Sequence, residues 1–183
     1  MTKKEIMKSV IGKFKQLNIP YQEMIDGGVA AFFTCLKAPD APNFRVEETI
    51  RFHDDCLEIL VYYDTLAEEI IKDMKNIGEL LRLLNYINAR VFLRCSDPYG
   101  YYKASLLFTP RIYLDEDSKN IVIVTVINYD FFSVAPVEAI DYILGYCPEL
   151  LNEFSYLIFN IVLGKITAEE AIKYIKENII KVG

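Results

Sequence analysis

The chain has 183 residues, of which 52% are hydrophobic and 25% charged, a composition typical of a folded globular protein rather than a disordered one. This length suits one domain, and we expect a single domain over residues 1–183. The 20 basic and 26 acidic residues give a net charge of −6, and an acidic chain without a basic stripe argues against nucleic-acid binding.

The cysteines and the apolar runs indicate a cellular compartment. Cys35, Cys56, Cys95 and Cys147 lie far apart without CxxC spacing, so we expect reduced, mostly buried thiols. The first eight residues carry charges every few positions and lack the apolar core of a signal peptide. No apolar run approaches the length of a membrane span. We therefore expect a cytoplasmic protein that does not bind membranes.

The first half of the chain predicts one helix followed by an antiparallel meander. Residues 3–17 carry apolar side chains at helical spacing between lysines. Asp26-Gly27-Gly28 is a hairpin turn signal. Four segments have the patterns of strands: 21–25, 29–36, 44–53 and 57–63.

Glu48 interrupts the clearest of these strand patterns. In Phe44–His53 the residues Phe44, Val46, Ile50 and Phe52 share one face, and Glu48 falls on that same apolar face. An inward-pointing charge is a device that protects edge strands from aggregation. We therefore expect this segment to be an edge strand.

The second half begins with a helix and returns to strands. Residues 66–89 have helical periodicity, and residues 101–108 are a further strand candidate. Two strands, Arg111–Leu114 and Ile121–Ile127, flank the polar turn Asp115–Asn120.

The C-terminal part predicts helices. Ser133 is a candidate N-cap, and Pro148 is expected to kink or divide the helix near Cys147. Thr167 to Glu170 has the spacing of a capping box, so a helical extension is expected over about 165–183. Strands in consecutive runs predict an α+β fold, with an antiparallel sheet framed by an N-terminal helix, a middle helix and C-terminal helices.

Several strands are apolar on both faces. Ile121–Ile127 does not alternate between apolar and polar residues, and Val29–Leu36 and Leu57–Tyr62 also carry apolar residues on both sides. Such strands are typical of a sheet with both faces covered. Either helices cover both faces, or one face takes a partner.

Four segments resemble the YbjN family, whose fold is shared with type III secretion chaperones. They are Arg51–Asp55 leading into Leu57–Tyr63, the helix end Leu83–Asn88, the hairpin Tyr113–Ile127, and Asp141–Pro148. The resemblance covers most of the chain from Lys3 to Leu163. Val91–Phe108 looks like an insertion relative to the family, and the helix after Thr167 looks like an extension. The resemblance implies a secretion-chaperone-like module that binds protein segments or dimerises without catalysis, and some family members are described as sensory-transduction regulators.

No residue pattern predicts catalysis, a metal or a cofactor. His53 is the only histidine, and a zinc site needs three or four ligands held together. In Asp115–Asn120 the glycine and the bidentate glutamate of a calcium loop are missing, since Asn120 and Val126 hold those positions. Cys56 follows His53 closely, but strand direction separates their side chains.

Aromatic clusters at predicted strand ends are candidates for partner binding, because tyrosine and phenylalanine bury large areas at interfaces. The candidate residues are Tyr99, Tyr101, Tyr102, Phe131 and Phe132, for which ordinary core packing is the alternative.

These observations favour a non-catalytic module that binds a protein segment or forms a homodimer. The alternative is a small-molecule-binding protein or an unusual enzyme with a pocket near residues 99–102.

Overall fold

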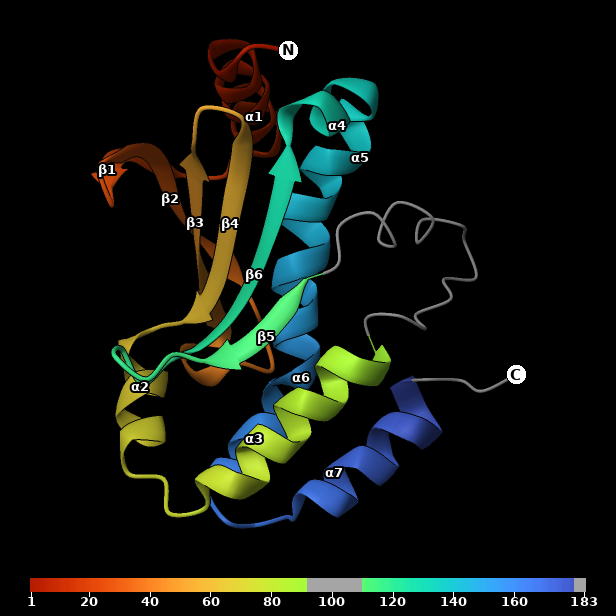
Figure 1. Ribbon diagram of the computed structural model, residues 1–183. Helices are drawn as coiled ribbons and strands as arrows, with labels where there is room; N and C mark the ends of the chain where they lie inside the picture. The colour runs from red at the N-terminus through yellow and green to blue at the C-terminus, as the bar shows by residue number, and fades with distance from the viewer. Residues whose placement is uncertain (92–109, 180–183) are drawn as a thin grey trace.

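The computed structural model describes residues 1–91 and 110–179, which form an α+β fold. Its six-stranded antiparallel sheet has the order β1-β2-β3-β4-β6-β5 (Figure 1). The strands are β1 Tyr21–Asp26, β2 Val29–Lys37, β3 Arg45–Phe52, β4 Cys56–Tyr63, β5 Arg111–Leu114 and β6 Ile121–Asn128. The helices are α1 Lys3–Leu17, α2 Thr65–Lys72, α3 Ile77–Tyr86, α4 Tyr129–Val134, α5 Pro136–Asp141, α6 Cys147–Val162 and α7 Ala168–Tyr174. The predicted fold class is confirmed.

Local sequence signals explain where α1 and the first hairpin begin and end. The Thr2 hydroxyl accepts a hydrogen bond from the Glu5 backbone N–H, and Glu5 Oε2 accepts one from the Thr2 backbone N–H, which completes a capping box. Asn18 ends α1 in the left-handed conformation at φ 54°. Gly27 and Gly28 have φ of 57° and 83°, the positive values that a tight β1–β2 turn requires.

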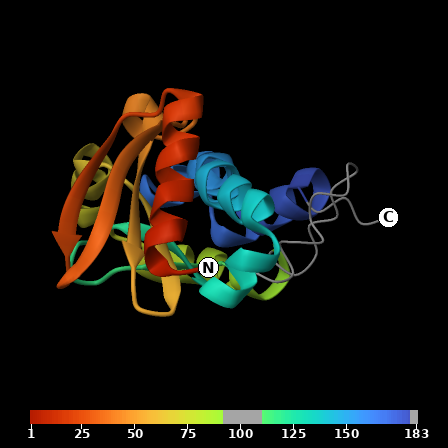
Figure 2. The same cartoon turned by 90° about the horizontal axis from the view of Figure 1, so that it is seen from above.

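The helices pack against one face of the sheet, which we call the covered face. Phe14 of α1 contacts Phe32 of β2, with ring centroids 6.3 Å apart. Tyr63 of β4 contacts Phe159 of α6, with centroids 4.9 Å apart. Figures 1 and 2 show α1, α4, α5 and α6 on this same side. The resulting core extends from Ile6 to Ile175.

The opposite face of the sheet, which we call the uncovered face, has no helix across it within residues 1–91 and 110–179 (Figure 2). Helix α2 lies only at one end of this face (Figure 1). The described part of the chain therefore forms two layers rather than three.

The predicted edge position of Glu48 is wrong. Strand β3 lies between β2 and β4 in the middle of the sheet, with Glu48 opposite Thr34 on one side and Val61 on the other. The alternation of a strand shows which face a residue points to, but it does not determine which strands flank it. Glu48 is instead a carboxyl group buried under the helices.

The helix expected over residues 66–89 is divided into α2 and α3. Asp64 begins α2 because its Oδ1 accepts hydrogen bonds from the backbone N–H groups of Leu66 and Ala67. The chain leaves helical geometry after Lys72 and resumes it at Ile77. Both helices turn apolar residues inward, so their combined pattern resembles that of one long helix.

Two C-terminal expectations are confirmed and one is wrong. Thr167 and Glu170 form the predicted capping box of α7. The helix changes near Pro148, where a π-helical turn over Tyr142–Tyr146 passes into α6. Ser133 is not an N-cap, because Asn128 caps α4 and the Ser133 hydroxyl donates to the Tyr129 carbonyl.

Helices α3 and α7 pack together at the β5 end of the sheet (Figure 1). Ala168, Ala171 and Ile175 are buried, so the C-terminal extension belongs to the same core. No helix within the two described segments has both the length and the apolar composition needed to cross a membrane.

Candidate binding face

The uncovered face carries a mixture of polar, aromatic and branched apolar side chains. Alternate residues of each strand point to it, and the strand register brings them into rows. Arg51 lies opposite Ala31 and Glu58, while Leu60 lies between Thr49 and Val124. The residues in register on this face are Gln22, Met24, Asp26, Val29, Ala31, Phe33, Cys35, Lys37, Arg45, Glu47, Thr49, Arg51, Cys56, Glu58, Leu60, Tyr62, Arg111, Tyr113, Val122, Val124, Val126 and Asn128.

Strand β6 explains the apolar pattern of Ile121–Ile127. Ile121, Ile123 and Ile127 are buried on the covered face. The intervening valines point to the uncovered face, where Val126 is 56% exposed. One apolar face of this strand is therefore covered by helices, and the other is without such a cover within the described residues.

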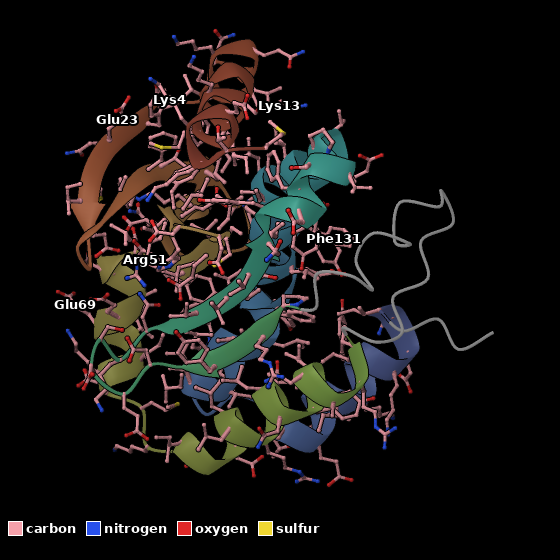
Figure 3. The ribbon with its side chains drawn as sticks, turned by 45° about the horizontal axis from the view of Figure 1, so that its top comes forward. Lys4, Lys13, Glu23, Arg51, Glu69 and Phe131 are labelled. Atoms are coloured by element: carbon pink, nitrogen blue, oxygen red, sulfur yellow. The ribbon has the colours of Figure 1, made fainter. Side chains whose placement is uncertain are left out.

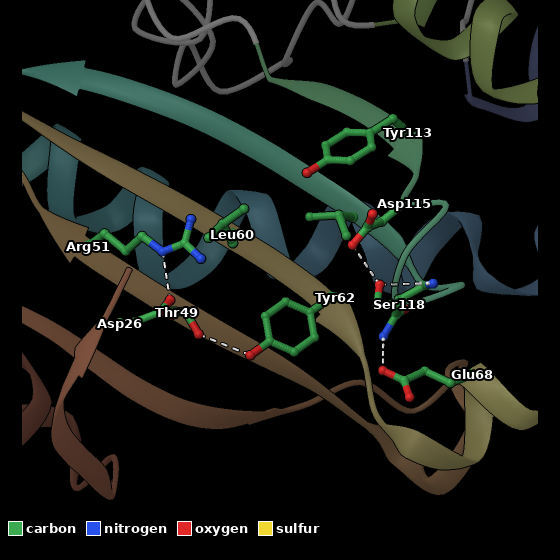
Figure 4. Close-up of a pocket in the computed structure, with 11 residues that line it drawn as sticks. Asp26, Thr49, Arg51, Leu60, Tyr62, Glu68, Tyr113, Asp115 and Ser118 are labelled. Carbon is green, nitrogen blue, oxygen red and sulfur yellow. Dashed lines mark hydrogen bonds and ion pairs between the residues drawn. The ribbon is translucent and has the colours of Figure 1, made fainter. Parts of the chain in front are cut away.

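A hollow of about 460 Å³ lies on the uncovered face near α2 (Figure 4). Its sides come from the five strands β1, β3, β4, β5 and β6, from α2 and from the β5–β6 turn. Its lining residues are Asp26, Thr49, Arg51, Leu60, Tyr62, Glu68, Tyr113, Asp115, Ser118, Asn120 and Val122. The volume falls within the range of about 300–1,000 Å³ typical of ligand sites.

Arg51 is held by two carboxylates. Its Nε donates to Asp26 Oδ2 at 2.6 Å (Figure 4), and its NH1 group donates to Glu58 Oε2 at 3.0 Å. Glu58 Oε2 also lies 3.3 Å from His53 Nε2. This places the single histidine in an ion-pair network at the end of β3. Among the described residues, no group of three or more His, Cys, Asp or Glu side chains is arranged to hold a metal ion.

Two tyrosines stand in the hollow, and their surroundings are acidic. The Tyr62 hydroxyl lies 2.9 Å from Thr49 Oγ1. Burial is the main cause that raises the pKa of Tyr62, and the charges of Glu47 and Asp26 raise it further. Burial also raises the pKa of Tyr113, with additional contributions from Asp115 and Glu58.

Asn120 fixes the end of the hollow and was not anticipated from the sequence. Its Nδ2 donates to the Tyr63 carbonyl at 2.7 Å and to Glu68 Oε1 at 3.1 Å. Its Oδ1 accepts from the backbone N–H groups of Tyr63 at 3.3 Å and Ile121 at 2.8 Å. One buried amide thus joins the β5–β6 turn, the end of β4 and helix α2. An asparagine directly before an apolar strand is the only sequence signal for this role.

The acidic turn before β6 satisfies its own hydrogen bonds. Asp115 accepts from the Ser118 hydroxyl at 2.7 Å and from the Asp117 backbone N–H at 3.2 Å. The bond from Ser118 is the main cause that lowers the pKa of Asp115. These contacts are those of a hairpin turn, as the sequence predicted.

Two of the predicted partner-binding aromatics, Phe131 and Phe132, do not lie on this face. Phe132 is fully buried in the core, and Phe131 packs against that core from α4, on the side opposite Arg51 (Figure 3). Tyr99, Tyr101 and Tyr102 lie outside the described residues, as does the pocket expected near residues 99–102. A role for these residues in binding stays a prediction.

Comparison of the chain with protein-family models, with curated proteins and with solved structures finds no match. The resemblance to the YbjN family therefore stays a prediction, and the function is argued from the geometry.

Proposed function

We propose that this protein is a non-catalytic binding module that holds a polypeptide segment of a partner protein on the uncovered face of its sheet. The observation that carries the proposal is the placement of the described helices on one face only, which leaves the opposite face of the sheet without a helical cover, with Val126 of β6 56% exposed on it. An exposed apolar surface surrounded by polar groups is a feature of interaction sites.

The contents of the hollow favour binding over catalysis. Its polar groups are already bonded to one another, as in the pairs Arg51–Asp26, Tyr62–Thr49 and Asp115–Ser118. The Ser118 hydroxyl donates to the Asp115 carboxylate, but this bond is one of those that close the hairpin turn and does not indicate an activated nucleophile. The expected likeness to secretion chaperones, which bind protein segments, favours the same class of function.

A site-specific photo-crosslinker tests this proposal. We expect p-benzoylphenylalanine at Val126 to capture a protein partner in cells, because this residue points outward from β6 and is exposed. Tyr156 of α6 is the matched control, since it is 60% exposed on the helical side of the molecule. Equal capture at both positions, or none at Val126, would refute the proposal.

The same experiment separates a foreign partner from self-association. A cross-linked species of twice the chain mass, in which both peptides come from this sequence, would identify the homodimer. Native mass measurement of the purified chain then gives its oligomeric state independently.

A further inference from the structure

The carboxylates around the hollow outnumber its cations. Among the described residues, Asp26, Glu68 and Asp115 line it, and Arg51 is the one basic residue of the lining. Asp26 and Glu58 already neutralise the Arg51 guanidinium. An anionic ligand would therefore meet uncompensated negative charge.

Two of these carboxylates lack a basic partner among the described residues. Glu68 accepts a hydrogen bond from the neutral amide of Asn120 at 3.1 Å. Asp115 accepts from the Ser118 hydroxyl and a backbone N–H group. Neither makes an ion pair with a lysine or arginine in residues 1–91 and 110–179. Both retain oxygen lone pairs that could accept from an ammonium or guanidinium group.

The remaining surfaces of the hollow suit a long cationic side chain. Tyr62 and Tyr113 approach from β4 and β5 (Figure 4), with Val122 between them in the strand register and Leu60 beside Tyr62 on β4. Apolar surface suits the methylene stem of a lysine or arginine, and tyrosine rings attract the charged end. The carboxylates that line the hollow can accept hydrogen bonds from that charged end.

The geometry points to a basic polypeptide segment as the partner, with a lysine or arginine side chain in the hollow and its flanking apolar residues along β6. This inference rests on the proposed function and specifies the chemistry of the partner. The net charge of −6 of the chain supports it, since opposite charge accelerates the encounter of binding partners.

Titration of the isotope-labelled full chain with three short peptides, followed by NMR, tests this inference. The peptides differ only at their centre, which is lysine, norleucine or glutamate, flanked by valine and threonine. We expect the lysine peptide to shift the resonances of Leu60, Tyr113 and Val122 at millimolar concentration. We expect it to bind about fivefold more tightly than the norleucine peptide.

Neighbouring glutamates of α2 provide a matched pair of variants. Glu68→Gln keeps an oxygen acceptor for Asn120 and removes the charge that lines the hollow, so it should weaken the lysine peptide about threefold. Glu69→Gln removes the same charge from a side chain that projects away from the sheet, and it should change the affinity little (Figure 3).

The outcomes separate this inference from the proposed function. Equal binding of the lysine and norleucine peptides at the uncovered face would overturn the basic preference and leave the binding face intact. A partner segment captured at Val126 that contains no lysine or arginine would do the same. Absence of binding by every peptide, together with absence of capture at Val126, would overturn both.

Discussion

The buried Glu48 is expected to make the protein less stable as the pH rises. Replacing Glu48 should remove this pH dependence. The Glu48 side chain is fully buried, and neither carboxyl oxygen has a hydrogen-bond partner among the described residues. Burial raises the pKa of this carboxyl well above its ordinary value. Cys147 faces it from α6, and burial raises the pKa of that thiol as well, so the thiol stays neutral and supplies no charge to Glu48.

The sign of the effect follows from the raised pKa. The folded state binds the Glu48 proton more tightly than the unfolded state does. In the unfolded state the pKa of a glutamate is about 4.3. The stability that the protonated Glu48 contributes is therefore complete below that value and is lost as the pH rises toward the folded pKa. The loss is about 1.4 kcal/mol per pH unit in that interval, or at most about 2.7 kcal/mol between pH 5 and 7.

Urea unfolding followed by circular dichroism, at each pH from 5 to 8, measures this effect. Relative to Glu48→Gln, the wild-type protein should lose free energy of unfolding steadily as the pH rises. Glu48→Met should also stabilise at pH 5, by about 1–3 kcal/mol, because it removes an unsatisfied polar group. Glu149→Gln, an exposed position on α6, is the control and should follow the wild type.

A constant difference between wild type and Glu48→Gln across this pH range would refute the reasoning. It would mean that the carboxyl group keeps the same protonation state in the folded and unfolded chain.

Three further substitutions test contacts that stabilise the fold. Urea unfolding measures the effect of each substitution. Asn120→Ala should cost about 2–3 kcal/mol, because it leaves both backbone groups of Tyr63 without partners. Asn88→Ala should cost about 1–3 kcal/mol of unfolding free energy. The Asn88 Nδ2 donates to the Ile112 carbonyl at 2.7 Å, and Asn88 Oδ1 accepts from the Ile112 backbone N–H at 2.9 Å. Hydrogen exchange of the Ile112 amide should therefore accelerate. Thr167→Ala should cost about 1 kcal/mol through loss of the capping box of α7.

Matched substitutions control for these predictions. Asn85→Ala changes the same residue type at an exposed position of α3, and Thr65→Ala does so at an exposed position in the first turn of α2. Both should stay within about 0.5 kcal/mol of the wild type. If Asn120→Ala or Asn88→Ala matched its control, the corresponding amide contacts would not contribute to stability.

Local patterns in the sequence were sufficient for most of the elements. The alternating and helical periods located α1, the β1–β4 meander and β6, and the capping-box spacing located the start of α7. These features depend on residues a few positions apart, which the sequence displays directly.

Features that depend on distant residues could not be predicted in this way. Strand β6 pairs with β4 across more than fifty residues, so its position inside the sheet was not evident from local patterns. The predicted meander alone places β3 between β2 and β4, so the edge position inferred from Glu48 conflicted with it. The hollow also depends on the pairing of β6 with β4, because it brings Tyr113 and Asn120 beside Tyr62 and Glu68. Tyr113 and Asn120 lie far along the sequence from Tyr62 and Glu68.

Tyr63 connects the two sides of the sheet. The Asn120 amide makes hydrogen bonds with the backbone N–H and carbonyl groups of Tyr63. The same amide donates to Glu68 at the hollow. The Tyr63 hydroxyl donates to the Leu151 carbonyl of α6 at 2.9 Å, on the covered face. A ligand that displaces Glu68 would therefore perturb a residue that is anchored in the helical layer. Tyr63 is thus a single residue whose hydrogen bonds connect the hollow on the outer face of the sheet with α6 on its inner face.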